Sequence, residues 1–244
     1  MSRKASLEVR QVVDAVCRSI ALDGTDLHHA FFPAHLSVAV IDAIFHSGLR
    51  PGERPAPAAE RYCRRFGIVP RRPDRWAPPP AGEQEPLGDL VRRYDETGVD
   101  EMAGTIFRSR RRSPGTKVSK AENVVRAARA LRRIGVDVLQ DVPARRPEEI
   151  DAALRPMPGI DEAAVRSLLM YTGPEQFVLG DSHVRRFVAS AIGTRAVSPR
   201  KAERLVRSAS HELILSPRLL DHEIWRHGVA GTGVARPPVP PDGI

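Results

Sequence analysis

Apolar side chains recur at helical spacing along most of the chain, and this pattern restricts the possible folds more than any other feature. Side chains three and four residues apart share one face of a helix, where they can be buried together. The pattern predicts helices over residues 6–22, 35–47, 57–66, 86–97, 99–108, 119–135, 147–154, 162–171, 181–192, 198–213 and 216–227. No segment shows the alternation typical of a strand, so we expect an all-α protein.

Length and charge narrow the class of protein. With 244 residues, the chain can form one large domain or two small lobes. Its net charge of +8 attracts polyanions, of which nucleic acid is the commonest, although a solvated basic surface is the alternative. No apolar run approaches membrane-spanning length, and the residues MSRKASLEVRQ lack the apolar core expected of a signal peptide. We therefore expect no membrane partner and a cytoplasmic, nucleoid-associated location.

Cysteine and histidine usage argues against a metal site. The two cysteines, Cys17 and Cys63, are too few for a four-cysteine iron–sulfur cluster. Both lie in helical patterns, so we expect buried thiols. His28, His29 and His35 lack the spacing of metal ligands, so the prediction is that the protein holds no metal.

The positive charge is concentrated between residues 105 and 135. This segment contains ten basic residues and one acidic residue, Glu122, which gives a local charge of +9. The basic residues are Arg108, Arg110, Arg111, Arg112, Lys117, Lys120, Arg126, Arg129, Arg132 and Arg133. Positive charges at this density repel one another, and binding of a polyanion removes this repulsion. Binding also releases counterions from the polyanion, which favours the complex. The segment favours a nucleic-acid partner, with Lys117 and Lys120 as phosphate contacts, although a solvated helix face is the alternative.

A Pro-Gly turn separates two short helical segments in the sequence LRPMPGIDEAAVRSLL, which begins at Leu154. Pro158 fixes its own φ angle and Gly159 permits a tight backbone path. Backbone N–H groups at the start of the second helix can then meet a phosphate, directly or through a bound cation. The turn residues Pro158, Gly159, Ile160 and Asp161 are thus candidate DNA contacts, while an ordinary helical corner is the alternative.

A lone Asp181 follows Gly180 and begins the basic segment HVRRFVASAIG. A carboxylate in this position can stabilise a cationic transition state and orient a water molecule. Aspartate is also among the best N-cap residues, so a capping role is the alternative. Arg185 and Arg186 follow in the same helix and are candidate phosphate contacts.

Together, these segments resemble the helix-hairpin-helix (HhH-GPD) superfamily of base-excision DNA glycosylases, the relatives of endonuclease III. The hairpin resembles its LPGxGxxTA motif, and FVLGDSHVRRF resembles its loop ending in the catalytic Asp, often written VDxHVxR. The resemblance implies a two-lobed helical fold with a cleft between the lobes. The expected lobes are a six-helix, barrel-like lobe at 34–160 with the hairpin at its edge, and a second lobe from 1–33 plus 161–228, before a disordered Pro/Gly tail at 229–244. It also implies a monomer that binds double-stranded DNA.

The chain departs from the family pattern at two hairpin positions. Asp161 stands where the motif has its second glycine, which places a negative charge near the expected phosphate. Ala163 stands where bifunctional members carry the lysine that forms a Schiff base. The resemblance therefore implies a monofunctional glycosylase without lyase activity and without an iron–sulfur cluster, in which Asp181 is catalytic. No cofactor is expected, although the hairpin backbone could hold an alkali cation, and a catalytically inactive DNA-binding protein is the alternative.

Glycosylases reach a base by flipping it out of the duplex and filling the gap with a wedge residue. In the family that this chain resembles, the wedge follows the central apolar helix, which here is expected at 35–47. Leu49 and Arg50 in the next loop are the candidates, and a loop residue without a role is the alternative. Within that helix, Asp42 and His46 are spaced i, i+4 and are predicted to form a structural hydrogen-bonded pair.

Overall fold

A computed structural model describes residues 3–22, 27, 31–48, 57–74 and 77–231. These residues form helices and connecting turns, and the β-structure among them is limited to two isolated bridges, Pro33–Arg71 and Arg112–Ser119. The prediction of an all-α protein is confirmed for this part of the chain. Leu49, Arg50, His28, His29 and most of the expected tail lie outside the described residues.

The chain forms two compact units, which we name the central unit and the terminal unit. The central unit holds the described residues 31–48, 57–74 and 77–172, and the terminal unit holds 3–22, 27 and 173–231. The sequence analysis placed the second boundary after residue 160, but the structure places it after Thr172. The reason is that the helix Glu162–Thr172 packs against the apolar helix Leu36–His46 of the central unit.

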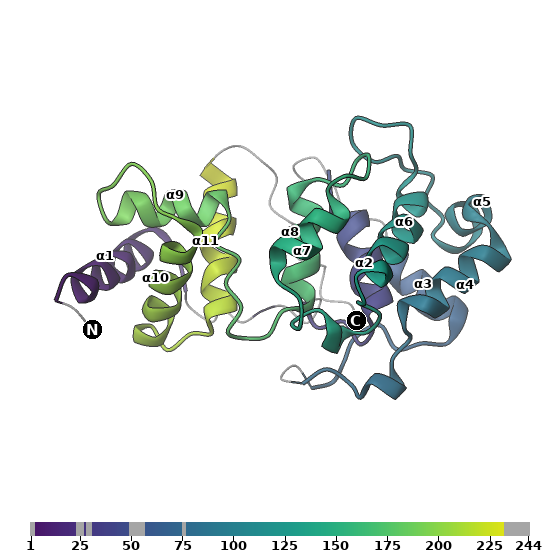
Figure 1. Cartoon of the computed structure of the whole chain (residues 1–244), viewed down its shortest axis with the longest axis horizontal. Coiled ribbons are helices and arrows are strands. Elements are labelled where there is room, and N and C mark those ends of the chain that lie inside the picture. The colour runs from purple at the N-terminus through teal and green to yellow at the C-terminus, as the bar shows by residue number, and fades with distance from the viewer. Residues whose placement is uncertain (1–2, 23–26, 28–30, 49–56, 75–76, 232–244) are drawn as a thin grey trace. The chain divides into compact units, whose positions relative to one another are not determined.

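Helix α2 is the centre of the central unit and is buried along almost its whole length. A helix that is apolar on all sides must be covered on all sides, and α2 packs against α3, α4, α6 and α8. The elements of this unit are α2 (Leu36–His46), α3 (Ala58–Phe66), η2 (Ala81–Glu83), α4 (Leu87–Thr97), α5 (Val99–Glu101), the π-helix η3 (Met102–Ile106), α6 (Lys120–Arg133), η4 (Leu139–Asp141), α7 (Pro147–Leu154) and α8 (Glu162–Thr172). Figure 1 shows α2 among these helices.

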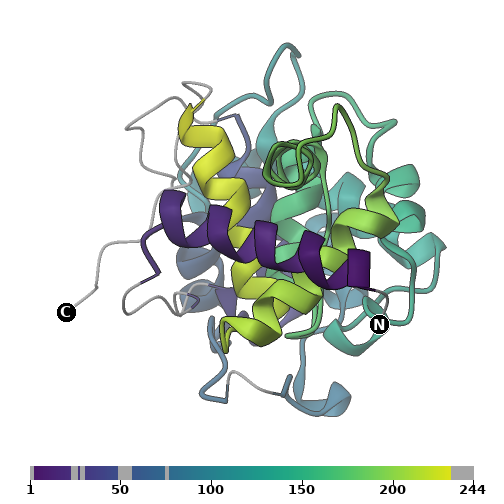
Figure 2. The ribbon, with the colours of Figure 1, turned by 90° about the vertical axis from the view of Figure 1, so that its left-hand side faces the viewer.

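The terminal unit joins the first helix of the chain to its last three. Its helices are α1 (Arg3–Ser19), α9 (Ser182–Ala191), α10 (Pro199–Glu212) and α11 (Pro217–Gly231). The stripe Val9, Val12 and Val16 packs into one core with apolar residues of α9, α10 and α11. Trp225 on α11 lies partly buried against this core. Figure 2 shows α1 lying beside the C-terminal helices.

Three N-caps explain where the longer polar helices begin. The side chains of Ser119, Asp181 and Ser198 accept hydrogen bonds from the first-turn amides of α6, α9 and α10. Each cap satisfies a donor that the helix cannot satisfy itself. The expected helix at 99–108 is different, because it divides into a short α-helix and the π-helix.

Lys120 is buried and bonds to the end of α2, so it cannot meet a phosphate as the sequence analysis expected. Its side chain is at the start of α6, and the residue is 3% exposed. The ammonium group donates to the carbonyl oxygens of Phe45 at 2.9 Å and Ser47 at 2.6 Å. Carbonyls at the C-terminal end of a helix carry partial negative charge and lack intrahelical donors. Lys120 therefore caps the central helix.

Replacing Lys120 by Met is expected to lower the free energy of unfolding by about 2–4 kcal/mol, because it leaves two buried carbonyls without donors. Lys117→Met removes the same charge from an exposed position and is expected to change stability by less than about 0.5 kcal/mol. Chemical denaturation of both variants measures the difference. Equal stability of the two variants would show that Lys120 is not a structural residue.

Two further groups of polar residues are built into the core of the central unit. Glu85 accepts hydrogen bonds from Ser37 and from Tyr62 at 2.8 Å, and pairs with Arg93 at 2.7 Å. Burial raises the pKa of Glu85. His35 accepts the amide hydrogen of Glu85 at 2.9 Å, and burial lowers the pKa of His35. These contacts hold the segment before α4 against α2.

The Asp42 carboxylate pairs with Arg71 at 2.7 Å, and not with His46. His46 Nδ1 instead lies 2.6 Å from the backbone carbonyl oxygen of Asp42. The predicted contact between the two residues is present, but through the Asp42 backbone, and the partner of the Asp42 carboxylate comes from another segment. Cys63 on α3 is buried, as expected, whereas Cys17 is exposed because it lies outside the apolar stripe of α1.

Candidate functional site

The hairpin between α7 and α8 is a tight turn held by its own backbone. Gly159 adopts a φ of +79°, a conformation that side-chain-bearing residues rarely reach. The Ile160 amide donates to the Met157 carbonyl at 3.2 Å, and the Ile160 side chain is buried at 5% exposure. Ile160 therefore anchors the turn in the core, which corrects its prediction as a DNA contact. Pro158 is exposed.

The turn is clamped by a second segment that the sequence analysis did not connect with it. We name residues 108–118 the basic loop. Asn123 on α6 donates to the Pro158 carbonyl at 2.9 Å and to the Ser113 hydroxyl of the basic loop at 2.7 Å. A Cβ atom added to Gly159 would lie 2.4 Å from the Cβ of Ser113. Glycine at this position is therefore needed for the close approach of the loop as well as for the φ angle.

The other end of α2 meets the same loop. Gly48 directly follows α2 and has a φ of +63°. A Cβ atom on Gly48 would lie 2.1 Å from Cγ of Pro114. The tip of the basic loop thus contacts both the end of the central helix and the hairpin turn. The candidate wedge residues Leu49 and Arg50 follow Gly48 in the sequence but lie outside the described residues.

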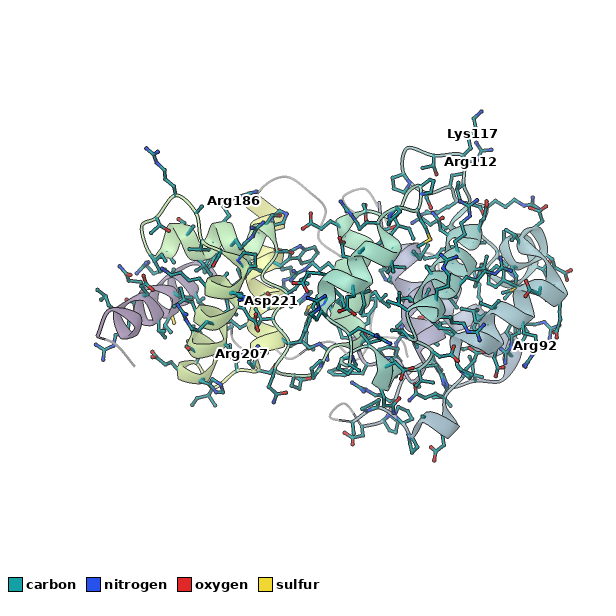
Figure 3. All side chains as sticks on the ribbon, viewed as in Figure 1. Arg92, Arg112, Lys117, Arg186, Arg207 and Asp221 are labelled. Carbon is teal, nitrogen blue, oxygen red and sulfur yellow. The ribbon has the colours of Figure 1, made fainter. Side chains whose placement is uncertain are left out.

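Some basic residues of the segment 105–135 form ion pairs with acidic residues, whereas others are exposed and could contact an anion. Three of its arginines pair with acids: Arg126 with Glu122, Arg129 with Asp95 at 2.5 Å, and Arg132 with Asp137 at 3.2 Å. Arg112 and Lys117 are exposed on the basic loop, and Figure 3 shows both at the edge of the central unit. Within the described residues, neither has an ion-pair partner. Part of the available charge of this segment therefore lies beside the hairpin turn.

The start of α8 is only partly available to a phosphate. Asp161 accepts the Ala164 amide at 2.8 Å and thus acts as an N-cap. The amides of Glu162 and Ala163 donate no hydrogen bond within the described part of the chain. These two N–H groups can meet an anion, but the Asp161 carboxylate already lies at the positive end of the helix dipole. A phosphate placed at this helix start would be repelled by the Asp161 carboxylate.

Asp161→Asn is expected to strengthen binding to duplex DNA by roughly three- to tenfold at low salt. Asparagine keeps the N-cap but removes the negative charge that repels a phosphate. The affinity for an undamaged duplex, measured by fluorescence anisotropy at several salt concentrations, gives the change. A weaker or unchanged affinity would exclude the start of α8 from the DNA-contacting surface.

The alkali cation that the family resemblance suggests would bind carbonyl oxygens of the turn, three of which already accept one hydrogen bond each. The carbonyl oxygens of Leu154 and Met157 accept amides within the turn, and that of Pro158 accepts from Asn123. A cation would have to share each of these oxygens with its present donor. The described residues also contain no group of three His, Cys, Asp or Glu side chains placed to hold a metal ion.

Asp181 caps α9, and its carboxylate is held in one orientation. Its Oδ1 accepts the amides of His183 at 2.9 Å and Val184 at 3.0 Å. Gly180 precedes it with a φ of +59°, and its amide donates to the fully buried Asp221 of α11 at 3.2 Å. Asp181 itself is half-buried. The predicted alternative, capping, is therefore confirmed, and the capping contacts fix the direction of the carboxylate.

The basic residues after Asp181 differ in exposure. Arg186 is exposed on α9, as Figure 3 shows, and can reach a phosphate. Arg185 is half-buried, and its Nε atom is buried without a partner among the described residues. His183 packs against α11, where a Cβ atom on Gly228 would lie 3.1 Å from the His183 Cβ. Of the two arginines, Arg186 is the better candidate contact.

A protein-family model matches most of the chain. No curated protein and no solved structure matches the chain. In the described residues, every helix is too short or too polar to cross a lipid bilayer. The family model for a domain of unknown function, DUF8548, matches residues 8–229 and thus includes helices of both units. The chain therefore belongs to the DUF8548 family.

Proposed function

We propose that the protein is a monofunctional DNA glycosylase, which hydrolyses the N-glycosidic bond of a damaged, modified or mismatched base in double-stranded DNA. In this proposal, the central and terminal units are the two lobes of a helix-hairpin-helix glycosylase fold. The central unit holds the DNA backbone, the terminal unit supplies the carboxylate, and the protein acts as a monomer. Base excision repair is the process in which such an activity belongs.

The observation that carries the proposal is the orientation of Asp181. Two amide hydrogen bonds fix its carboxylate, and Asp221 fixes the glycine turn before it. Electrostatic catalysis requires such a group to be in place before charge develops, because reorganisation during the reaction would cost free energy. The motif around Asp181 also stands in the order hairpin, Gly-Asp, basic helix that the glycosylase family shows.

The chemistry needs one carboxylate and one water molecule. As the bond between C1′ of the deoxyribose and the base nitrogen breaks, its electron pair leaves with the base and positive charge develops on the sugar. The Asp181 carboxylate stabilises this charge and accepts a proton from the attacking water, whose oxygen bonds to C1′. The base takes up a proton, and the products are the free base and an abasic site.

The absence of a hairpin lysine limits the reaction to hydrolysis. Position 163 is an exposed alanine at the start of α8. An amine nucleophile would form a Schiff base with C1′ and lead to strand cleavage, whereas alanine has no nucleophile. The expected product is therefore an abasic site in an intact strand.

A catalytically inactive DNA-binding protein is the second candidate function. Asp161 favours it, because this carboxylate lies at the helix start where a phosphate would bind. Such a protein would still use the basic loop and the hairpin to hold DNA, but Asp181 would serve only as an N-cap.

A panel of duplexes separates the two candidates. Each duplex carries one alkylated, deaminated, oxidised or mismatched base and is incubated with excess protein, then analysed with and without alkaline cleavage. The proposal expects strand breaks after alkali for at least one substrate, and none without it. Salt-sensitive binding to every duplex with no alkali-labile site in any would favour the inactive protein, and nicking without alkali would contradict the monofunctional mechanism.

A further inference from the structure

A shallow hollow on the central unit, away from the hairpin turn in sequence, is lined mainly by arginines. One part has a volume of about 340 Å³ and is lined by Arg61, Arg64, Arg65, Thr105, Ile106 and Arg108. The adjoining part, of about 510 Å³, shares Thr105 and Arg108 and adds Arg110. We name these two parts the arginine hollow. Neither part has an acidic residue among its described lining residues.

The backbone around the arginine hollow is unusual in two places. The π-helix Met102–Ile106 forms one wall, and π-helical turns occur often at functional sites. Arg108 follows with a φ of +49°, a left-handed conformation that is strained for a side-chain-bearing residue. Gly104 leaves room for Arg110, whose guanidinium would lie 3.1 Å from a Cβ atom there. Arg108 therefore lies beside the arginines of α3, and Arg110 lies against the π-helix in the adjoining part of the hollow.

The charges of the arginine hollow are not neutralised by the protein. Arg61 donates to the Phe107 carbonyl at 2.7 Å and is thereby held in place. Arg64, Arg65, Arg108 and Arg110 are exposed, and none forms an ion pair within the described residues. Arg64 and Arg65 lie in the last turn of α3, where positive charge stabilises the helix dipole. The dipole accounts for basic residues at these two positions. It does not account for Arg108 and Arg110, which line the same hollow from another segment. Converging guanidinium groups without acids are suited to phosphate.

We propose that the arginine hollow binds backbone phosphates of double-stranded DNA and extends the contact made by the hairpin. This inference rests on the DNA-binding part of the proposed function and does not require base release. The basic loop connects the two contacts, because Arg108 and Arg110 line the hollow while Ser113 lies against Gly159. Five residues span at most about 17 Å, and one strand rises about 3.4 Å per nucleotide. Both contacts thus fall within about five nucleotides of each other.

The shape of the hollow favours a passing strand over an enclosed small molecule. Pockets for small ligands are concave, mostly apolar and bury most of the ligand surface. The arginine hollow is open to solvent, and arginines dominate its lining. A DNA strand presents phosphates to such a surface without being enclosed, and each neutralised phosphate releases counterions.

The test uses the full chain with three arginines removed. The variant is Arg64→Gln, Arg65→Gln and Arg110→Gln, which leaves Arg61 and its bond to Phe107 intact. The matched control is Arg92→Gln, Arg129→Gln and Arg146→Gln, which removes the same charge from exposed, acid-paired arginines of the same unit. Arg108→Asn serves as a separate variant, because asparagine tolerates the left-handed conformation and removes the guanidinium.

Affinity for an undamaged duplex of about 25 base pairs is measured across a range of salt concentrations. The triple variant is expected to bind at least about tenfold more weakly near 0.1 M salt, with the salt slope reduced by about 0.9 per lost phosphate contact. Arg108→Asn should reduce the salt slope by the amount expected for one lost phosphate contact. The control variant should have the affinity and the salt slope of the wild type. A triple variant with the affinity and slope of the control overturns the inference.

Two further outcomes separate this inference from the others. Inorganic tripolyphosphate is titrated into the same proteins by calorimetry. Tight binding of tripolyphosphate that the triple variant loses, with DNA affinity unchanged, would assign the hollow to a free phosphate ligand and overturn the DNA assignment. The wild type could release no base from any duplex while the triple variant still shows a smaller dependence of DNA affinity on salt. That result would support the inference and contradict the glycosylase proposal. No duplex binding by the wild type overturns both.

Discussion

Replacing Asp181 by Asn is expected to lower the rate of base release at least about a hundredfold while the protein remains folded. Asparagine caps a helix as well as aspartate does, and its side-chain oxygen can accept the amides of His183 and Val184. The negative charge that stabilises the developing cation on the sugar is lost. The substitution therefore separates the proposed catalytic role of Asp181 from its capping role.

Two further variants show whether the loss of base release is specific to the charge of Asp181. Asp161→Asn changes the N-cap of α8 in the same way and should leave the rate of base release unchanged once the protein is saturated with DNA. Asp181→Ala should lose base release and also about 0.5–2 kcal/mol of stability, because alanine cannot cap. Single-turnover rates and thermal unfolding are measured for all three variants. An Asp181→Asn variant that releases base at the wild-type rate would leave Asp181 as an N-cap only.

Replacing Gly159 by Ala is expected to destabilise the central unit by about 2–4 kcal/mol and to weaken DNA binding at the hairpin. A φ of +79° costs a side-chain-bearing residue about 1–2 kcal/mol. The added Cβ would also lie 2.4 Å from the Ser113 Cβ, an atom fixed to the backbone that cannot move aside by rotation. Either the turn or the basic loop must shift, and both belong to the surface that we propose for DNA.

Gly67→Ala is the matched control, because Gly67 has a φ of +67° but no atom within 4 Å of the added Cβ. It should show the backbone cost alone and no change in DNA affinity. Ser113→Gly removes the contacting atom, so the double variant with Gly159→Ala should recover part of the lost stability. Equal unfolding free energies for the Gly159 and Gly67 variants, with no coupling to Ser113, would contradict the close contact.

The positions of the helices were predictable, because strong local signals define them. The valine stripe of α1 needs a buried face, and Ser119, Asp181 and Ser198 supply the oxygen atoms that begin their helices. These signals act over a few residues and do not depend on the rest of the chain. The π-helix after Glu101 carries no such local signal, so a single helix was expected there.

The parts of the site that depend on distant contacts were not predictable from sequence. Lys120 stands in a run of charges that usually faces water, and only the position of the α2 carbonyls explains its burial. The clamp of the basic loop on the hairpin depends on Asn123, which is 35 residues from Pro158. Pro114-Gly115 is a dipeptide typical of turns, but no local pattern indicates what such a turn contacts.

The central claim is that Asp181 faces positive charge on the sugar of bound DNA, and it can be tested without knowledge of the damaged base. The measurement compares the affinities of the protein for two duplexes that carry a sugar analogue in place of one nucleoside. One analogue is a cationic pyrrolidine, which resembles the charged transition state, and the other is a neutral tetrahydrofuran. A carboxylate placed for the transition state should bind the cationic analogue at least about a hundredfold more tightly, and Asp181→Asn should abolish the difference. Equal affinity of the wild type for the two duplexes would contradict the claim.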